Sequence, residues 1–191
     1  MNLLLDQGKL EWDAREQAQR YQGAVPFPHI VIDDFLPLDA FRRLCGDFPG
    51  PEDRLWFKFQ SGAENLKLQS QDFYAIPDSL RALITELNGP AFVNYLQDVS
   101  GIQGLIPDPH LYGGGLHQTL PGGHLGIHVD YNFHTDWKLD RRLNVIYYLN
   151  EAWEDDWGGH LELWDKEVKE RVQRIAPKGN RLVIFNTDEY S

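Results

Sequence analysis

The sequence predicts an α+β fold in which N-terminal helices pack on a double-stranded β-helix, or jelly roll. Apolar residues recur at helical spacing through much of residues 1–100. From about residue 105, short apolar runs alternate with Gly, Pro, Asn and Asp, which is typical of short strands joined by turns. Helices followed by strands indicate an α+β protein rather than alternating β-α units. A chain of 191 residues favours a single structural domain.

Residues 1–100 are predicted to form a helical support region with one edge strand. The β-branched run Pro26–Asp33 predicts that strand, and its prolines place it at a sheet edge because proline cannot donate a ladder hydrogen bond. Asp78 or Ser79 is expected to cap one helix. Apolar stripes with Pro or Gly boundaries predict helices over residues 10–21, 37–48, 79–87 and 92–99.

Residues 105–191 are predicted to form the jelly-roll core. The strands are expected at about residues 110–120, 125–131, 143–149, 160–164, 172–175 and 182–185. The run 143–150 is almost continuously apolar, which predicts a central strand covered on both faces. Asn144 and Tyr148 share one face of it. Because buried polar groups need partners, they either face a polar ligand or bond to neighbouring backbone.

Composition and charge argue against several classes of partner. Eighteen basic and 29 acidic residues give a net charge of −11, which disfavours binding to a phosphate backbone. No apolar run is long enough to cross a bilayer, and the first residues lack the basic region of a signal peptide. The single Cys45 excludes an internal disulfide and fits a reducing compartment. A cytoplasmic protein that binds neither nucleic acid nor membrane is therefore expected.

His128 and Asp130 are the strongest candidate metal ligands. Both lie in the run 125–131, which is predicted to be a strand entered through a tight turn at Gly122-Gly123. Side chains two residues apart on a strand point to the same face, so an imidazole and a carboxylate can converge on one ion. The alternative is an exposed strand on which the two side chains only pair with each other.

An ordered series of motifs resembles the prolyl-4-hydroxylase-type iron(II)/2-oxoglutarate dioxygenases. The resemblance covers about residues 110–190, with weaker similarity at Pro26–Leu36. The motifs are Leu111–Gln118, His128–Asp130, Arg141–Asn150, Trp157–Trp164 and Asn180–Phe185. Together they are far more specific than a His-x-Asp pair alone.

The resemblance implies a jelly roll that holds iron through two histidines and one carboxylate. His128 and Asp130 match the first two ligands. Tyr148 matches a tyrosine that hydrogen-bonds the distal carboxylate of 2-oxoglutarate, and Leu161 matches an apolar residue lining that pocket. Gln118 falls where some relatives carry a cosubstrate-contacting tyrosine, and Asn144 completes the predicted cofactor-binding set. Fe(II) and 2-oxoglutarate are the expected cofactors, with ascorbate as a further candidate.

The sequence departs from this family at its end. The family's third ligand, a histidine, and a basic residue that binds 2-oxoglutarate follow the strand corresponding to residues 182–185. Neither is present before Ser191. The expectation is therefore a fragment of a longer reading frame, whose 191-residue form binds Fe(II) weakly and turns over little.

The predicted function is hydroxylation of a prolyl peptide or a small metabolite, with succinate and CO2 as coproducts. No side chain is assigned as an acid, base or nucleophile, because the cofactors carry the redox chemistry. Two alternatives stay open: a cupin-like metalloenzyme that does not use 2-oxoglutarate, and a non-catalytic jelly-roll binding module. The sequence leaves the oligomeric state undetermined.

Overall fold

A computed structural model describes residues 4–59, 64–189 and 191 of the chain. The described part combines helices with small antiparallel sheets, which is compatible with an α+β oxygenase fold. The helices are α1 (Gln7–Gln22), α2 (Leu38–Gly46), α3 (Asp78–Leu87), α4 (Pro90–Ser100) and the short 3-10 helix η1 (Asp155–Trp157). The strands are β1 (His29–Ile32), β2 (Phe57–Phe59), β3 (Glu64–Ser70), β4 (Leu116–Leu125), β5 (Phe133–His134), β6 (Leu139–Asp140), β7 (Leu143–Tyr148), β8 (Leu161–Trp164), β9 (Arg171–Ile175) and β10 (Arg181–Asn186).

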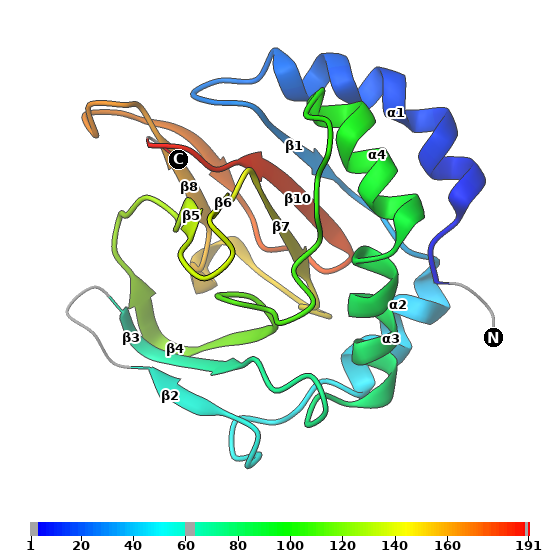
Figure 1. Cartoon of the computed structure of the whole chain (residues 1–191). Coiled ribbons are helices and arrows are strands. Elements are labelled where there is room, and N and C mark those ends of the chain that lie inside the picture. The colour runs from blue at the N-terminus through cyan, green and yellow to red at the C-terminus, as the bar shows by residue number, and fades with distance from the viewer. Residues whose placement is uncertain (1–3, 60–63, 190) are drawn as a thin grey trace.

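The described strands pair in four antiparallel groups. The orders are β1-β10-β7, β2-β3-β4, β5-β6 and β8-β9. Figure 1 shows α1 and α4 on one side of the β1-β10-β7 sheet and β8 on the other side. These pairings do not by themselves define a closed jelly roll in the described part of the chain.

The four predicted α-helices are confirmed, with one difference in capping. The Asp6 side chain accepts a hydrogen bond from the Lys9 amide at 3.1 Å and so begins α1, which ends at Gly23. In α3, Asp78 is the first helical residue and the cap position is Pro77, which makes no side-chain cap bond. The prediction that Asp78 or Ser79 caps this helix is therefore wrong, because the fixed φ of Pro77 already starts the turn.

Two apolar clusters lie on opposite faces of the β1-β10-β7 sheet. Leu182 and Ile184 of β10 are fully buried in the cluster that the helices complete. Val183 and Phe185 point the other way, into a smaller cluster with Leu163 of β8 and Ile175 of β9. This alternation follows from the two-residue period of a strand. Strand β10 is therefore covered on both faces.

The expected edge strand is confirmed, but the expected central strand is not. β1 lies at one edge of its sheet and pairs antiparallel with β10, where His29 lies opposite Phe185. Among the described strands, β7 pairs with β10 alone, so β10 and not β7 is central. The near-continuous apolar run of β7 has another cause, since its two faces pack against the two apolar clusters.

Other strand boundaries also differ from the prediction. Residues 110–115 are irregular, and the strand occupies 116–125 instead. Gly122 and Gly123 lie within β4, not in a turn before a strand, and Gly122 takes the positive φ of 80°. β2 and β3 were not predicted, because β3 is mostly polar and Leu68 is its one buried apolar residue among those described.

Close approach of two backbones explains the glycine at position 115. Ser70 of β3 lies opposite Leu116 of β4. A Cβ atom at Gly115 would lie 2.1 Å from the Ser70 carbonyl oxygen, and Gly115 has a φ of 92°. Only glycine fits both conditions without displacing a strand.

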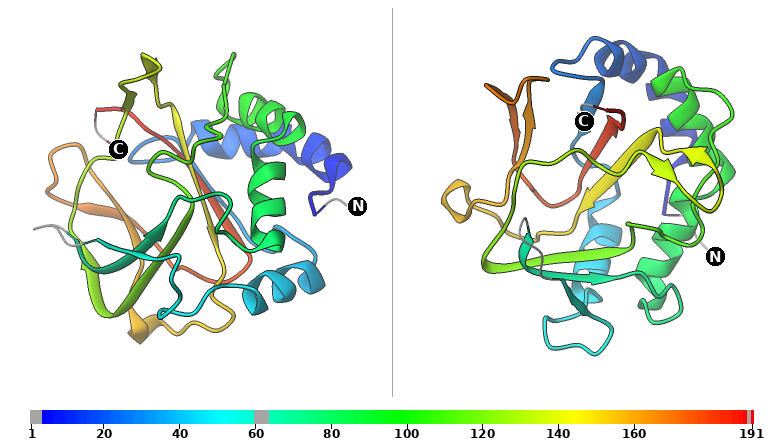
Figure 2. Two further views of the ribbon diagram at one scale, coloured as in Figure 1. Left: turned by 60° about the horizontal axis from the view of Figure 1, so that its bottom comes forward. Right: turned by 60° about the vertical axis from the view of Figure 1, so that its left-hand side comes forward.

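The two views of Figure 2 show the β2-β3-β4 sheet next to the helical layer, with the carboxyl-terminal end near the β5-β6 hairpin. Within residues 4–59, 64–189 and 191, no helix has both the length and the apolar character needed to cross a bilayer.

Candidate functional site

His128 and Asp130 lie in an irregular segment between β4 and β5. The predicted strand over 125–131 is wrong beyond Leu125, which ends β4. Ile127 and Val129, which alternate with the two candidate ligands, are each 55% exposed and do not form a buried face. The alternation resembles that of a strand, but no neighbouring strand pairs with residues 126–132 in the described structure.

The two candidate side chains nevertheless converge. His128 Nε2 lies 3.3 Å from Asp130 Oδ1, and the His128 side chain is 43% exposed. The other ring nitrogen, Nδ1, lies 2.8 Å from the Gly126 carbonyl oxygen. Because a carbonyl oxygen only accepts hydrogen bonds, Nδ1 carries a proton. Nε2 and the carboxylate oxygen then require a cation between them, which is either a second proton or a metal ion.

Asp130 is held by contacts from several parts of the chain. Its backbone amide donates to the Ser191 carbonyl oxygen at 3.0 Å. The Asn144 side-chain amide donates to Asp130 Oδ2 at 2.5 Å. Burial alone would raise the pKa of Asp130, but hydrogen bonds from His128 and Asn144 and the charge of Arg141 outweigh it. The pKa of Asp130 therefore lies below its ordinary value, which favours the charged carboxylate that binds metal.

The His128–Asp130 pair fits two ligands of one divalent ion. Ligand bonds of about 2.1 Å allow one ion to reach two atoms up to about 4.2 Å apart. The observed 3.3 Å between Nε2 and Oδ1 lies within that limit. Across the described ranges, no group of three or more His, Cys, Asp or Glu side chains surrounds a common point. The residues present therefore supply two protein ligands, one nitrogen and one oxygen.

Three of the four predicted cosubstrate residues lie on the same side of the β1-β10-β7 sheet. Asn144 and Tyr148 share one face of β7, as the alternation predicts. Tyr148 and Leu161 both pack against the smaller apolar cluster. The structure therefore brings Asn144, which contacts Asp130, onto the face that Tyr148 and Leu161 also line.

Tyr148 and Gln118 have properties that suit contact with a polar ligand. Burial raises the pKa of Tyr148 to about 12, although the Arg181 guanidinium opposes the rise. Its hydroxyl is therefore protonated at neutral pH and available to donate to a carboxylate. Gln118 lies in β4, and its buried Oε1 atom has no hydrogen-bond partner among the described residues. A buried acceptor without a partner is unfavourable, so a bound group that donates a hydrogen bond to it would stabilise the site.

A cluster of aromatic side chains that includes Tyr131, the residue after Asp130, was missed by the sequence reasoning. Trp137 stacks on His134 with centroids 4.8 Å apart, and Tyr112 lies 5.1 Å from both His134 and Tyr131. Arg141 lies over the Tyr131 ring at 5.9 Å. Residue 112 is distant in sequence from 131–137, so periodicity could not reveal the contact. A high density of aromatic residues beside the His-x-Asp motif was the available signal.

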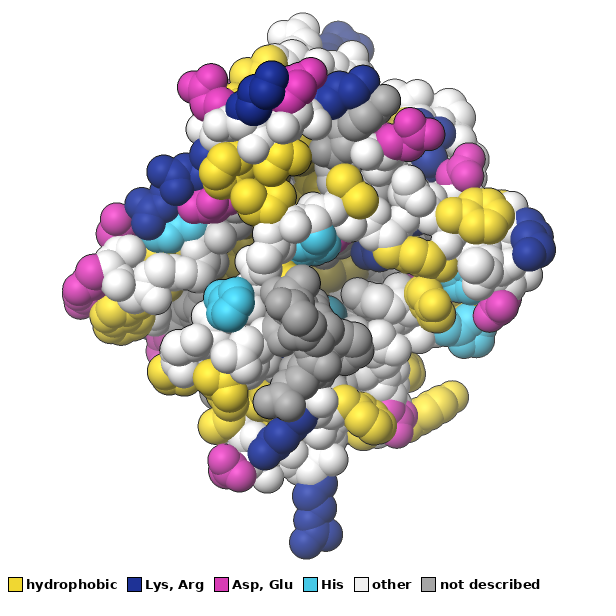
Figure 3. All heavy atoms as spheres, turned by 90° about the vertical axis from the view of Figure 1, so that its left-hand side faces the viewer, with side chains coloured by type: hydrophobic (Ala, Val, Ile, Leu, Met, Phe, Trp, Pro, Cys, Tyr) yellow, Lys and Arg dark blue, Asp and Glu magenta, His cyan; other side chains and the backbone are white. Residues whose placement is uncertain are grey.

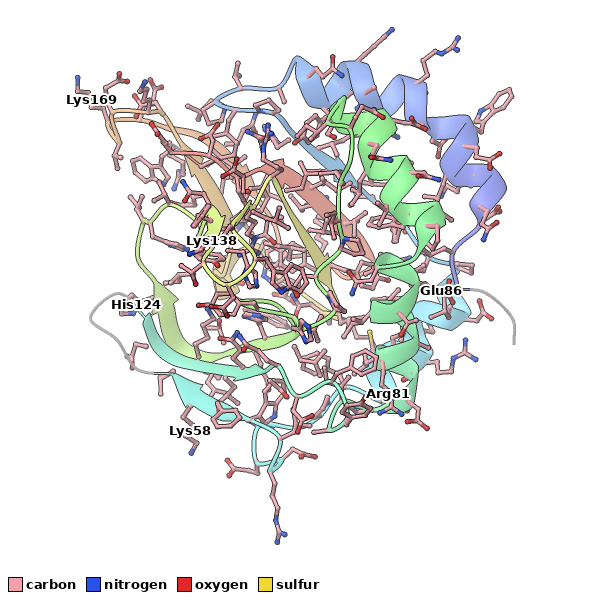
Figure 4. All side chains as sticks on the ribbon, viewed as in Figure 1. Lys58, Arg81, Glu86, His124, Lys138 and Lys169 are labelled. Carbon is pink, nitrogen blue, oxygen red and sulfur yellow. The ribbon has the colours of Figure 1, made fainter. Side chains whose placement is uncertain are left out.

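Two views show side chains of the molecule. On the face shown in Figure 3, histidine side chains lie at several separate places, with apolar patches among them. His124 lies in β4 opposite Asn65, and Figure 4 places it beside the end of that strand. Figure 4 also labels Lys138 on the hairpin that follows the candidate ligands.

Two comparisons with known proteins bear on the family of this chain. Residues 114–191 match the family model of the 2OG-Fe(II) oxygenase superfamily, and this segment contains every predicted site residue. A curated relative is the mouse protein named "Prolyl 3-hydroxylase OGFOD1", at 29% identity over 182 residues. The match covers 87% of this chain and 29% of the mouse protein. These findings show a similarity to the 2OG-Fe(II) oxygenase superfamily over residues 114–191, which is less than half of the chain.

Proposed function

We propose that this chain forms part of an Fe(II)- and 2-oxoglutarate-dependent oxygenase of the prolyl 4-hydroxylase-like type. The observation that carries the proposal is the approach of His128 Nε2 to Asp130 Oδ1, with His128 Nδ1 donating to the Gly126 carbonyl oxygen. A neutral imidazole and an ionised carboxylate are two of the three ligands of the facial triad. Residues 105–191 would form the jelly-roll core, and residues 1–100 would form its helical support.

Each candidate residue has a role that its surroundings support. His128 and Asp130 would hold the iron, which together with 2-oxoglutarate and dioxygen supplies the oxidising chemistry. Tyr148 would donate a hydrogen bond from its hydroxyl group to the distal carboxylate of 2-oxoglutarate. Leu161 would exclude water from the same pocket. Gln118 would contact 2-oxoglutarate through its side-chain NH2 group, because the cosubstrate offers only acceptor oxygens. Asn144 has a second amide proton besides the one given to Asp130, so it can contact the cosubstrate as well.

We propose hydroxylation of a prolyl peptide or a small metabolite, with succinate and CO2 as coproducts. The printed name of the mouse relative supports a prolyl substrate. The exposed rings of Tyr112 and Trp137 both contact His134, four residues after Asp130. They support a substrate with a flat or apolar group, because such groups pack on aromatic faces. Ascorbate is proposed as an accessory reductant.

We further propose a cytoplasmic protein that acts without nucleic acid or membrane. The net charge of −11 supports the exclusion of nucleic acid, since phosphate backbones are bound by basic surfaces. The single Cys45 supports a reducing compartment.

The test measures oxygen uptake and succinate formation by the Fe(II)-loaded chain with 2-oxoglutarate. We expect slow succinate formation in step with oxygen uptake, and its loss in both His128→Ala and Asp130→Ala. His124→Ala is the matched control, because His124 is exposed in β4 and makes no contact with the pair in the described structure. It should keep the wild-type rate.

Two outcomes would overturn the proposal in different directions. Oxygen uptake without succinate would indicate the cupin-like alternative. Absence of both oxygen uptake and succinate formation, with 2-oxoglutarate binding unchanged in His128→Ala, would indicate the non-catalytic binding module.

A further inference from the structure

We propose that Asn144 is a positioning residue that orients the Asp130 carboxylate toward His128. The inference rests on the proposed function, because it assigns a role within the same metal site. Asn144 lies on β7, opposite Phe185 of β10, and is thus part of the hydrogen-bonded sheet. Asp130 lies in the irregular segment after β4. The bond between the two side chains therefore joins the candidate ligand to a rigid element.

The geometry assigns different tasks to the two carboxylate oxygens of Asp130. Oδ2 accepts the Asn144 amide proton at 2.5 Å, whereas Oδ1 lies 3.3 Å from His128 Nε2. The terminal torsion of an aspartate side chain is broad, so it does not select one orientation by itself. A short hydrogen bond to an ionised oxygen is stronger than a neutral one. Asn144 therefore holds Oδ2 and leaves Oδ1 as the oxygen that faces the cation.

The backbone contact of Asp130 and its contact with His128 do not fix the orientation of its carboxylate from a strand. The bond from its backbone amide to the Ser191 carbonyl oxygen fixes the main chain but not the carboxylate torsion. His128 is itself 43% exposed and is tied to Gly126 through a two-residue contact within the same irregular segment. Without the Asn144 amide, the Asp130 carboxylate can rotate about its terminal torsion. The ligand pair then loses its preorganised spacing.

Asn144→Ala should therefore lower the affinity for metal while the chain stays folded. Loss of a residue that orients a metal ligand lowers affinity by about 10- to 100-fold. The probe is Mn(II) alone, titrated into the 191-residue chain and followed by the electron paramagnetic resonance signal of the free ion. Co(II) gives a second readout, because its visible absorption reports the ligand geometry. Asn144→Ser, which keeps a shorter donor, should recover part of the affinity.

Asn150→Ala is the matched control. Asn150 follows the same strand, and its amide donates to the Pro177 carbonyl oxygen at 2.5 Å, so this substitution removes a comparable bond away from Asp130. We expect less than a twofold change in Mn(II) affinity for this variant. Equal losses of affinity in the Asn144 and Asn150 variants would overturn the inference and indicate a general structural effect.

The outcomes separate the inference from the proposed function. If His128→Ala binds Mn(II) as tightly as the wild type, the metal site itself is wrong. If His128→Ala loses binding but Asn144→Ala does not, only the positioning role is wrong. Crystal structures of metal-free wild type and Asn144→Leu, which keeps the side-chain volume, provide a readout without metal. An unchanged distance between His128 Nε2 and Asp130 Oδ1 in the variant would overturn the inference.

Discussion

Strand β10 and the irregular segment 126–132 lie close together but are held in place by different forces. Leu182, Val183 and Ile184 of β10 are fully buried and packed between two apolar clusters. In the segment, Ile127 and Val129 are more than half exposed, and the contacts that hold it include hydrogen bonds to Asn144, Ser191, Asp188 and Arg141. Apolar burial scales with area and has no direction, whereas hydrogen bonds impose distance and angle. The strand therefore provides stability and the segment provides geometry.

Because of this difference, we expect that the stability of the chain and the geometry of the site can be changed separately. A substitution in β10 is expected to unfold the chain before it alters the site. A substitution in the segment is expected to alter the site while the sheet persists. Three measurements of unfolding test the contrast.

The largest effect is expected for Leu182→Ala. Leu182 is fully buried, so its removal loses transfer free energy and leaves a cavity that the sheet cannot fill. The free energy of unfolding should fall by about 2–5 kcal/mol, measured by urea titration. Leu38→Ala is the control, because Leu38 is 55% exposed at the start of α2 and should change stability by less than about 0.5 kcal/mol. Equal effects at the two positions would contradict the contrast.

A smaller, pH-dependent effect is expected at the rim of the same sheet. The Arg181 guanidinium donates to both carboxylate oxygens of Asp33, at 2.6 and 2.8 Å. That hydrogen bonding lowers the pKa of Asp33 despite partial burial. Because the folded pKa lies below the unfolded one, the stabilisation is present above the unfolded pKa and is lost as the pH falls through the folded pKa.

Asp33→Asn should therefore be less stable than the wild type at neutral pH, by no more than about 1 kcal/mol because the Asp33 carboxylate is 58% exposed. Thermal unfolding at neutral and at strongly acidic pH checks this. The difference should disappear in acid. Asp34→Asn, at the exposed neighbouring residue, should show none at either pH, and a constant deficit for Asp33→Asn would argue against an ionic contribution.

The smallest effect is expected for Ile127→Ser. In a buried strand, this substitution would cost several kcal/mol, but Ile127 is 55% exposed beside His128. The expected change in the free energy of unfolding is within about 0.5 kcal/mol. A loss above about 2 kcal/mol would show that residues 125–131 form a buried strand after all.

Much of the scaffold was predictable because its signals are local. The stripe through Leu10, Ala14 and Tyr21 predicts α1, and Gly23 ends it as expected. The run 182–185 predicts β10 by its β-branched and apolar residues. The strands that pair with β10 are harder to predict from the sequence, because the pairing joins segments that are distant along the chain. That is why β7 was wrongly placed at the centre of the sheet.

The candidate site was predictable only in part. The His-x-Asp spacing identifies His128 and Asp130, but it also suggested a strand that the structure lacks. Alternation of apolar and polar residues has the same appearance in a half-exposed irregular segment. The bond from Asn144 to Asp130 depends on how that segment folds back, which no local pattern records.

The glycine run at residues 113–115 has a consequence for how freely this chain tolerates change. At position 114 the space around an added methyl group is ordinary, with the nearest atom 3.7 Å away. At position 115 an added methyl group would overlap the Ser70 carbonyl oxygen, and the opposed pair of Ser70 and Leu116 would have to separate. Two adjacent residues of identical type thus differ in mutability: the space at Gly114 admits a methyl group, whereas Gly115 is a steric requirement of the pairing between β3 and β4.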